Sequence, residues 1–189
     1  CRHCYRDCYQ PLKEPPIEAL LSLLDRISDF INRRGVPGRI QFCGGEPLLS
    51  EVLLPLVKKA QRTHHLPCRI LSNGTLATAE LAQRLADVGV SIVQVSLDGD
   101  RAQHDAWRGE GSFDRALEGI RHLSTAEIEV TVAATLSRDN VDDITEITKI
   151  AAHSGAQRLA FARLVSQGTG ADLRERLLSA EEWLDAQVR

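Results

Sequence analysis

The sequence contains no methionine among its 189 residues, and it begins with a cysteine. We therefore expect a piece of a longer protein. No apolar run of about eighteen residues occurs, so a transmembrane helix is not expected, and no secretory signal peptide is visible. The net charge is only −3 and the pI is near 6.1, which argues against general nucleic-acid binding.

Several nucleotide and metal motifs are also missing. Neither Gly-x-Gly-x-x-Gly nor Gly-x-x-x-x-Gly-Lys-Ser/Thr occurs, so an α/β enzyme for another nucleotide is only a weak alternative. Cysteine is present five times, at Cys1, Cys4, Cys8, Cys43 and Cys68. An odd number, with three members inside eight residues, makes a poor disulfide framework and a better metal or cluster site. This usage favours a reducing, cytoplasmic compartment.

The Cys1-Arg2-His3-Cys4 spacing fits zinc, iron–sulfur or redox chemistry. A zinc ribbon would need a second Cys-x-x-Cys pair, and the sequence has none. A thioredoxin-like dithiol would follow a strand and open a helix, whereas residues 1–15 read as a loop. The spacing alone leaves the choice among these chemistries open.

Helical and strand-like segments alternate along the chain. Apolar periodicity predicts helices over residues 17–34, 51–63 and 77–88, a helix around Phe113–Leu123, one from 140 to 155 and one starting at 180. Strands are predicted over 39–42, 68–71, 91–95, 129–136 and 158–164, and residues 100–111 read as a polar loop. Such alternation predicts parallel strands with right-handed crossovers, that is, one α/β domain with a curved sheet or partial barrel.

Small, polar and acidic residues follow three consecutive predicted strands. They are Gly44, Gly45 and Glu46, then Ser72 and Asn73, then Ser96 and Asp98. The ends of parallel strands meet at one edge of a sheet, so we expect these residues to converge on one ligand. Taken singly, Asn73-Gly74 and Asp98-Gly99 are also ordinary turn formers.

These motifs together resemble the radical S-adenosylmethionine (AdoMet) superfamily. Cys1-Arg2-His3-Cys4-Tyr5 looks like the second half of the motif Cys-x-x-x-Cys-x-aromatic-Cys, with His3 at the aromatic position. Gly44-Gly45-Glu46-Pro47-Leu48 is similar to the family's Gly-Gly-Glu motif. Ser96-Leu97-Asp98-Gly99, followed by His104-Asp105 and Arg108-Gly109, resembles the branch with an extra cluster domain, called SPASM or twitch.

The resemblance implies a partial (βα)6 TIM-type barrel that lacks its first strand. Residues 1–170 would form the core, and residues 171–189 would begin a linker toward an auxiliary domain. The first of the three cluster cysteines would lie four residues before Cys1. Cys8 is the alternative third ligand, although its spacing is reversed.

The resemblance also implies a 4Fe-4S cluster and AdoMet as cofactors. Cys1 and Cys4 would be cluster ligands. The backbone of Gly44 and Gly45 and the Glu46 carboxylate would bind the AdoMet amino group. Ser72 and Ser96 would contact its ribose or carboxylate, with Asn73 and Asp98 as further contacts, and Arg108 would pair with its carboxylate. Leu164 would contact the adenine through its backbone, and His3 would pack near the adenine. Arg108 is equally readable as a solvated loop arginine, and His104 and Asp105 as substrate-steering or loop contacts.

In this family the reduced cluster cleaves AdoMet to methionine and a 5′-deoxyadenosyl radical, which abstracts hydrogen from a substrate. The implied role is an oxidoreductase in peptide, haem or cofactor maturation. Expected partners are a small-molecule or peptide substrate and an electron donor such as a flavodoxin or ferredoxin, without nucleic acid or membrane. The alternative is a non-catalytic metal-binding or interaction module on a degenerate barrel.

Overall fold

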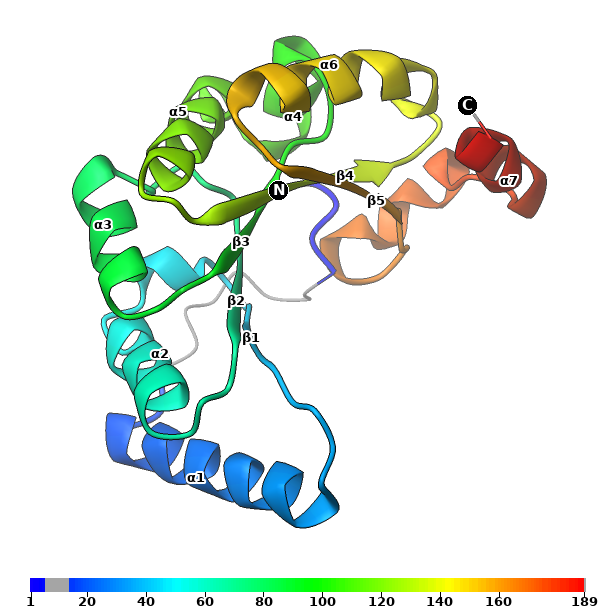
Figure 1. The fold of residues 1–189 in the computed structure, drawn as a ribbon. Coiled ribbons are helices and arrows are strands. Elements are labelled where there is room, and N and C mark those ends of the chain that lie inside the picture. Colours follow the sequence, from blue (N-terminus) through cyan, green and yellow to red (C-terminus); the bar gives the residue numbers. More distant parts are fainter. Residues whose placement is uncertain (6–13, 189) are drawn as a thin grey trace.

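Five parallel strands form one sheet in the order β1-β2-β3-β4-β5, and helices connect them (Figure 1). This computed structural model describes residues 1–5 and 14–188. The strands are β1 (Ile40–Phe42), β2 (Cys68–Ser72), β3 (Ile92–Ser96), β4 (Glu129–Leu136) and β5 (Arg158–Arg163). The helices are α1 (Ile17–Arg34), α2 (Leu53–Arg62), α3 (Ala79–Asp87), α4 (Arg101–Arg108), α5 (Ser112–Thr125), α6 (Ile144–Ser154) and α7 (Ala180–Val188), with 3-10 turns η1 (Pro47–Leu49), η2 (Val141–Asp143) and η3 (Gly168–Arg176).

The alternation of strands and helices confirms the predicted α/β class and the partial, barrel-type sheet. All four strand pairings are parallel, as the crossover helices require. The register pairs Ser72 with Val95, and Ser96 with Ala133. The carboxyl ends of β2 and β3 therefore lie at the same edge, which we call the rim.

The prediction of a polar loop over residues 100–111 is wrong, because α4 occupies most of it. The Asp100 side chain accepts a hydrogen bond from the Gln103 N–H and caps the helix. His104 and Trp107, three residues apart, are its buried residues. Asp105 accepts from the N–H of Phe113 at 2.8 Å, so it fixes the start of α5. The sequence of α4 has only one short apolar stripe among charged residues, and this pattern is a weak signal for a helix.

The helices α2, α3, α5 and α6 cover one face of the curved sheet, while the chain start and η3 lie on the other side (Figure 1). The main core fills the space between strands and helices. Its fully buried members include Ile70, Leu85, Val93, Val95, Ile120, Leu123, Val130 and Val132. Each such side chain stabilises the fold by roughly 1.5–3 kcal/mol, so this core fixes the strands whose ends build the rim.

Residues after 170 pack against the carboxyl end of β4. Leu178 is 2% exposed and joins a second apolar cluster with Leu136 and Ile147. Arg138 forms an ion pair with Glu182 of α7 at 3.0 Å. The division of the chain at residue 170 stays a prediction. Over the described ranges, every helix is too short or too polar to cross a membrane.

Candidate functional site at the rim

Glu46 joins the ends of β1 and β2. Its Oε1 accepts a hydrogen bond from Ser72 Oγ at 2.6 Å, and its Oε2 accepts from the Asn73 backbone N–H at 2.8 Å. Oε1 also accepts from the Leu48 N–H at 3.1 Å, which caps η1. The Asn73 side chain points elsewhere, since its Oδ1 accepts from the Thr75 N–H at 2.8 Å. The structure thus unites Glu46 and Ser72, while Asn73 contributes its backbone.

The glycine pair before Glu46 leaves the rim open. Gly44 has a φ of +149°, a conformation that L side chains rarely adopt. A Cβ on Gly45 would meet no heavy atom of the described residues within 4 Å. Gly45 and Glu46 line the same hollow. A ligand can therefore reach the backbone beside the carboxylate without meeting a side chain.

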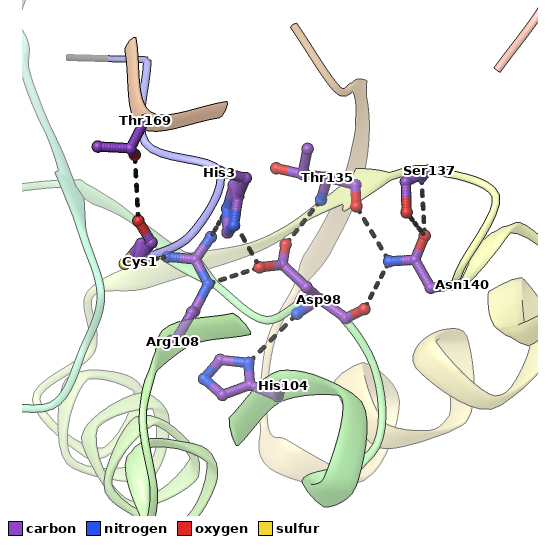
Figure 2. Close-up of polar contacts among 9 residues, drawn as sticks. All are labelled: Cys1, His3, Asp98, His104, Arg108, Thr135, Ser137, Asn140 and Thr169. Atoms are coloured by element: carbon purple, nitrogen blue, oxygen red, sulfur yellow. Dashed lines mark hydrogen bonds and ion pairs between the residues drawn. The ribbon is translucent and has the colours of Figure 1, made fainter. Parts of the chain in front are cut away.

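Asp98, which follows β3, is 1% exposed and fully engaged. Its Oδ1 accepts from the Thr135 N–H at 2.8 Å, and its Oδ2 accepts from Arg108 Nε at 2.5 Å (Figure 2). Burial by itself would raise the pKa of Asp98. The Arg108 charge, together with His3 and the Thr135 N–H, outweighs burial and holds that pKa below its usual value. Asp98 is therefore a buried carboxylate paired within the protein.

Asn140, which the sequence did not assign to the site, and His104, a candidate for steering substrate or for a loop contact, hold the backbone around Asp98. Asn140 Nδ2 donates to the Asp98 carbonyl at 2.7 Å and to the Thr135 carbonyl at 3.0 Å. His104 Nδ1 accepts from the Asp98 N–H at 3.3 Å. Burial lowers the pKa of His104 to about 4, and the Arg108 charge adds to this. Asn140 was readable only as a helix-opening residue, because its partners lie far away in the sequence.

Arg108 connects Asp98 to the start of the chain. Its Nη2 lies 3.1 Å from His3 Nε2, and its Nη1 lies 3.9 Å from Cys1 Sγ (Figure 2). The His3 ring packs on Trp107 with the ring centroids 4.9 Å apart. Burial, and then the Arg108 charge, lower the pKa of His3 to about 4. A neutral His3 accepts from Arg108, so its ring orientation depends on the Asp98–Arg108 pair.

The front loop, residues 1–4, is also held from the other end of the chain. Thr169 Oγ1 donates to the Cys4 carbonyl at 3.0 Å and lies 3.4 Å from the Cys1 carbonyl. The Gly170 N–H donates to the Cys4 carbonyl at 3.3 Å. A Cβ on Gly170 would lie 3.5 Å from the His3 Cα, so η3 packs closely on the loop. The Thr169 hydroxyl therefore lies within hydrogen-bond distance of the carbonyls of both Cys1 and Cys4.

Thr169→Val should loosen the front loop, since valine keeps the shape and loses the hydroxyl. The loss of about 1 kcal/mol for one neutral hydrogen bond predicts roughly fivefold faster exchange of the Arg2 amide. That amide donates to the Trp107 carbonyl at 2.9 Å and reports on loop docking. Residue-resolved hydrogen exchange measures the rate. Thr169→Ser, which retains the hydroxyl, should exchange like the parent, and equal rates in both variants would contradict the anchor.

Ser96 and Leu164 lie at strand ends but outside this network of contacts. Ser96 is half-buried at the end of β3, two residues before Asp98. Leu164 directly follows β5, is 4% exposed, and donates its N–H to the Leu136 carbonyl at 3.0 Å. The structure places both near the expected edge, and their roles toward a ligand stay predictions.

The donor atoms of the front loop suit an iron–sulfur cluster. Cys1 is exposed and Cys4 is half-buried. Thiolates are the usual ligands of such clusters. Within residues 1–5 and 14–188, no three His, Cys, Asp or Glu side chains converge as a metal site, and Cys8 lies outside those residues. The described residues supply two side chains of the right type for such a cluster, on a loop that is bonded to Arg108 and Thr169.

A family profile described as the Radical SAM superfamily matches residues 1–151. The chain belongs to the radical SAM superfamily. Members of this superfamily use a 4Fe-4S cluster and AdoMet, which agrees with the cofactors that the motifs implied. The profile covers the front loop and the strand ends through β4.

Curated relatives agree with this radical SAM assignment, and solved structures show the same fold. An AdoMet-dependent heme synthase from Nitratidesulfovibrio vulgaris is 34% identical over 187 residues, which cover 97% of this chain and 49% of the relative. Mycofactocin maturase MftC from Mycolicibacterium smegmatis is 35% identical, covering 92% of this chain and 43% of that protein. The chain thus spans about half the length of the curated relatives it matches. A structure of anSMEcpe with bound AdoMet and Cp18Cys peptide superposes with a TM-score of 0.75 at 19% identity, covering 98% and 53% of the two chains, and shows the shared fold.

Proposed function

We propose that the whole protein is a radical AdoMet enzyme of haem, cofactor or peptide maturation. The observation that carries the proposal is the docking of the front loop: Arg108 and Thr169 hold its two cysteines against the strand ends. Haem and cofactor maturation are proposed by analogy with two relatives, an AdoMet-dependent heme synthase and a mycofactocin maturase. A peptide substrate also agrees with the peptide in the similar anSMEcpe structure.

In this proposal Cys1 and Cys4 bind the cluster as thiolates. When bound, the cluster supplies the electron that cleaves AdoMet reductively. Thr169 fixes the carbonyls of both cysteine residues, and this limits the motion of their sulfur atoms. The buried Asp98–Arg108 pair fixes the inner side of the same loop. These residues orient the ligands of the cluster and do no chemistry themselves.

The proposed AdoMet contacts follow the open part of the rim. The backbone at Gly44 and Gly45 and the Glu46 carboxylate bind the amino group, because a carboxylate strengthens hydrogen bonds from a cationic donor. Ser72 and Ser96 contact the ribose or the carboxylate. The backbone near Leu164 and the ring of His3 lie at the adenine, and the partner in electron transfer is a flavodoxin or ferredoxin.

The proposal is tested by forming 5′-deoxyadenosine. The full-length protein, reconstituted anaerobically with iron and sulfide, should release 5′-deoxyadenosine from AdoMet after reduction by dithionite, as measured by mass spectrometry. Cys4→Ala should abolish the product, because it removes a proposed cluster ligand. Cys68→Ala is the matched control: Cys68 is 1% exposed within the core, so the product should persist.

A full-length protein that binds a cluster and never yields 5′-deoxyadenosine would contradict the enzyme proposal. That result would favour the non-catalytic metal-binding module instead. Equal product from Cys4→Ala and the parent would contradict the assigned ligand and leave the activity intact.

A further inference from the structure

The guanidinium of Arg108 lies between a buried carboxylate and a cysteine thiol. Its Nε donates to Asp98 Oδ2 at 2.5 Å, and its Nη1 points at Cys1 Sγ at 3.9 Å, within the range for a hydrogen bond to sulfur (Figure 2). The planar guanidinium presents its donors in a fixed fork. Binding at the Asp98 edge therefore fixes the direction of the donor that faces Cys1.

The pair is well protected from solvent and has few ways to move. The side chains of Arg108 and Asp98 are 11% and 1% exposed. Asp98 is itself held at Oδ1 by the Thr135 N–H, and Arg108 contacts His3 through its Nη2. The result is a rigid dipole whose positive end faces the thiol of Cys1. In such surroundings charge effects are much less screened than at the surface.

A donor aimed at a cluster sulfur acts on redox behaviour. Reduction adds one negative charge to the cluster and its thiolates. A hydrogen bond to a ligand sulfur, or a nearby positive charge, stabilises the reduced form more than the oxidised form. The potentials of iron–sulfur clusters are set by these hydrogen bonds, by net charge and by solvent exposure.

We propose that Arg108, anchored by Asp98, donates to the Cys1 thiolate and raises the reduction potential of the cluster. Asp98 is then a positioning residue that acts through Arg108, and no contact between Asp98 and AdoMet is needed. The inference rests on the proposed function, since it requires Cys1 to be a cluster ligand. It assigns to Arg108 a role that exists before AdoMet binds.

The test is the midpoint potential of the cluster without AdoMet. The full-length protein and its variants are reconstituted anaerobically, and the reduced cluster is followed by electron paramagnetic resonance during a redox titration. The double variant Asp98→Asn with Arg108→Gln removes both buried charges together, so neither is left unpaired. At the midpoint potential of the parent, the double variant should have a ratio of reduced to oxidised cluster about tenfold lower than that of the parent. For a one-electron couple, this corresponds to a midpoint potential about 59 mV lower.

Arg108→Lys keeps a positive partner for Asp98 and serves if the double variant folds poorly. A lysine ammonium lacks the fork that binds the carboxylate and the thiol at once, so its potential should also fall, by a smaller amount. Arg101→Gln is the matched control. It removes one positive charge from the same helix, at an exposed pair with Asp114, and should leave the potential unchanged.

An unchanged potential in the double variant and in Arg108→Lys would overturn the inference, while 5′-deoxyadenosine released by the same parent protein would still uphold the proposed function. A shift as large in Arg101→Gln would also overturn it, because an exposed charge on the same helix would then change the potential as much as the buried pair beside Cys1 does. A parent protein that binds no cluster would overturn both proposals.

Discussion

Replacing Asp98 by alanine should lower the free energy of unfolding by about 3–5 kcal/mol, because it leaves the largely buried Arg108 without its counter-ion. The carboxylate is 1% exposed, and the variant also strands the Thr135 N–H that it accepts at 2.8 Å. Urea unfolding of the protein before cluster reconstitution, followed by circular dichroism, measures this loss without any contribution from bound metal.

Two further variants separate the ion pair from the general cost of mutation. Asp98→Asn combined with Arg108→Gln should be less destabilising than Asp98→Ala, because no charge remains unpaired. Asp114→Ala breaks an exposed pair with Arg101 and should leave the unfolding midpoint nearly unchanged. If Asp98→Ala behaves like Asp114→Ala, the buried pair does not stabilise the fold.

Glu46→Gln should weaken AdoMet binding roughly ten- to hundredfold, since a charge-assisted hydrogen bond contributes about 1.5–3 kcal/mol. Glutamine keeps the shape of the side chain and loses the charge that would attract the amino group. Its amide NH2 also faces a backbone donor wherever it is placed, because the Leu48 N–H donates to Oε1 and the Asn73 N–H to Oε2. Equilibrium dialysis of AdoMet against the reconstituted full-length protein measures the dissociation constant.

The matched control for this variant is Glu51→Gln, an exposed glutamate five residues along the chain. It removes the same charge and should bind AdoMet like the parent. Unfolding by urea is recorded for both variants, because Glu46 also joins β1 to β2. If the Glu46→Gln protein is less stable yet binds AdoMet normally, Glu46 only connects β1 to β2 and does not bind AdoMet.

The rim was predictable from the sequence because local rules fix it. Parallel strands bring their carboxyl ends to one edge, so residues at or shortly after the ends of β1 and β2 had to lie close together. The contact between Glu46 and Ser72 follows from that rule and from the strand register. The glycine pair was also identifiable locally, since a turn beside a ligand needs an open backbone.

The contacts of Asp98 and of the front loop were not predictable in this way. The pair of Arg108 and His3 joins residues 105 positions apart, and Thr169 meets Cys1 across 168 positions. No periodicity encodes such contacts. The short helix α4, which the sequence did not indicate, is also what turns Arg108 toward Asp98. The partners of Asp98 therefore required the folded structure.

The hydrogen bond between Thr169 and the front loop sets the order in which parts of the chain can dock during synthesis. At the usual 5–20 residues per second, the ribosome completes the threonine about 10–30 seconds after the two thiols. Until then nothing on the nascent chain can offer that hydroxyl to their carbonyls, which lie 168 and 165 positions away. In the proposed enzyme, docking of the loop that carries the two cysteines therefore waits until the ribosome has passed β5.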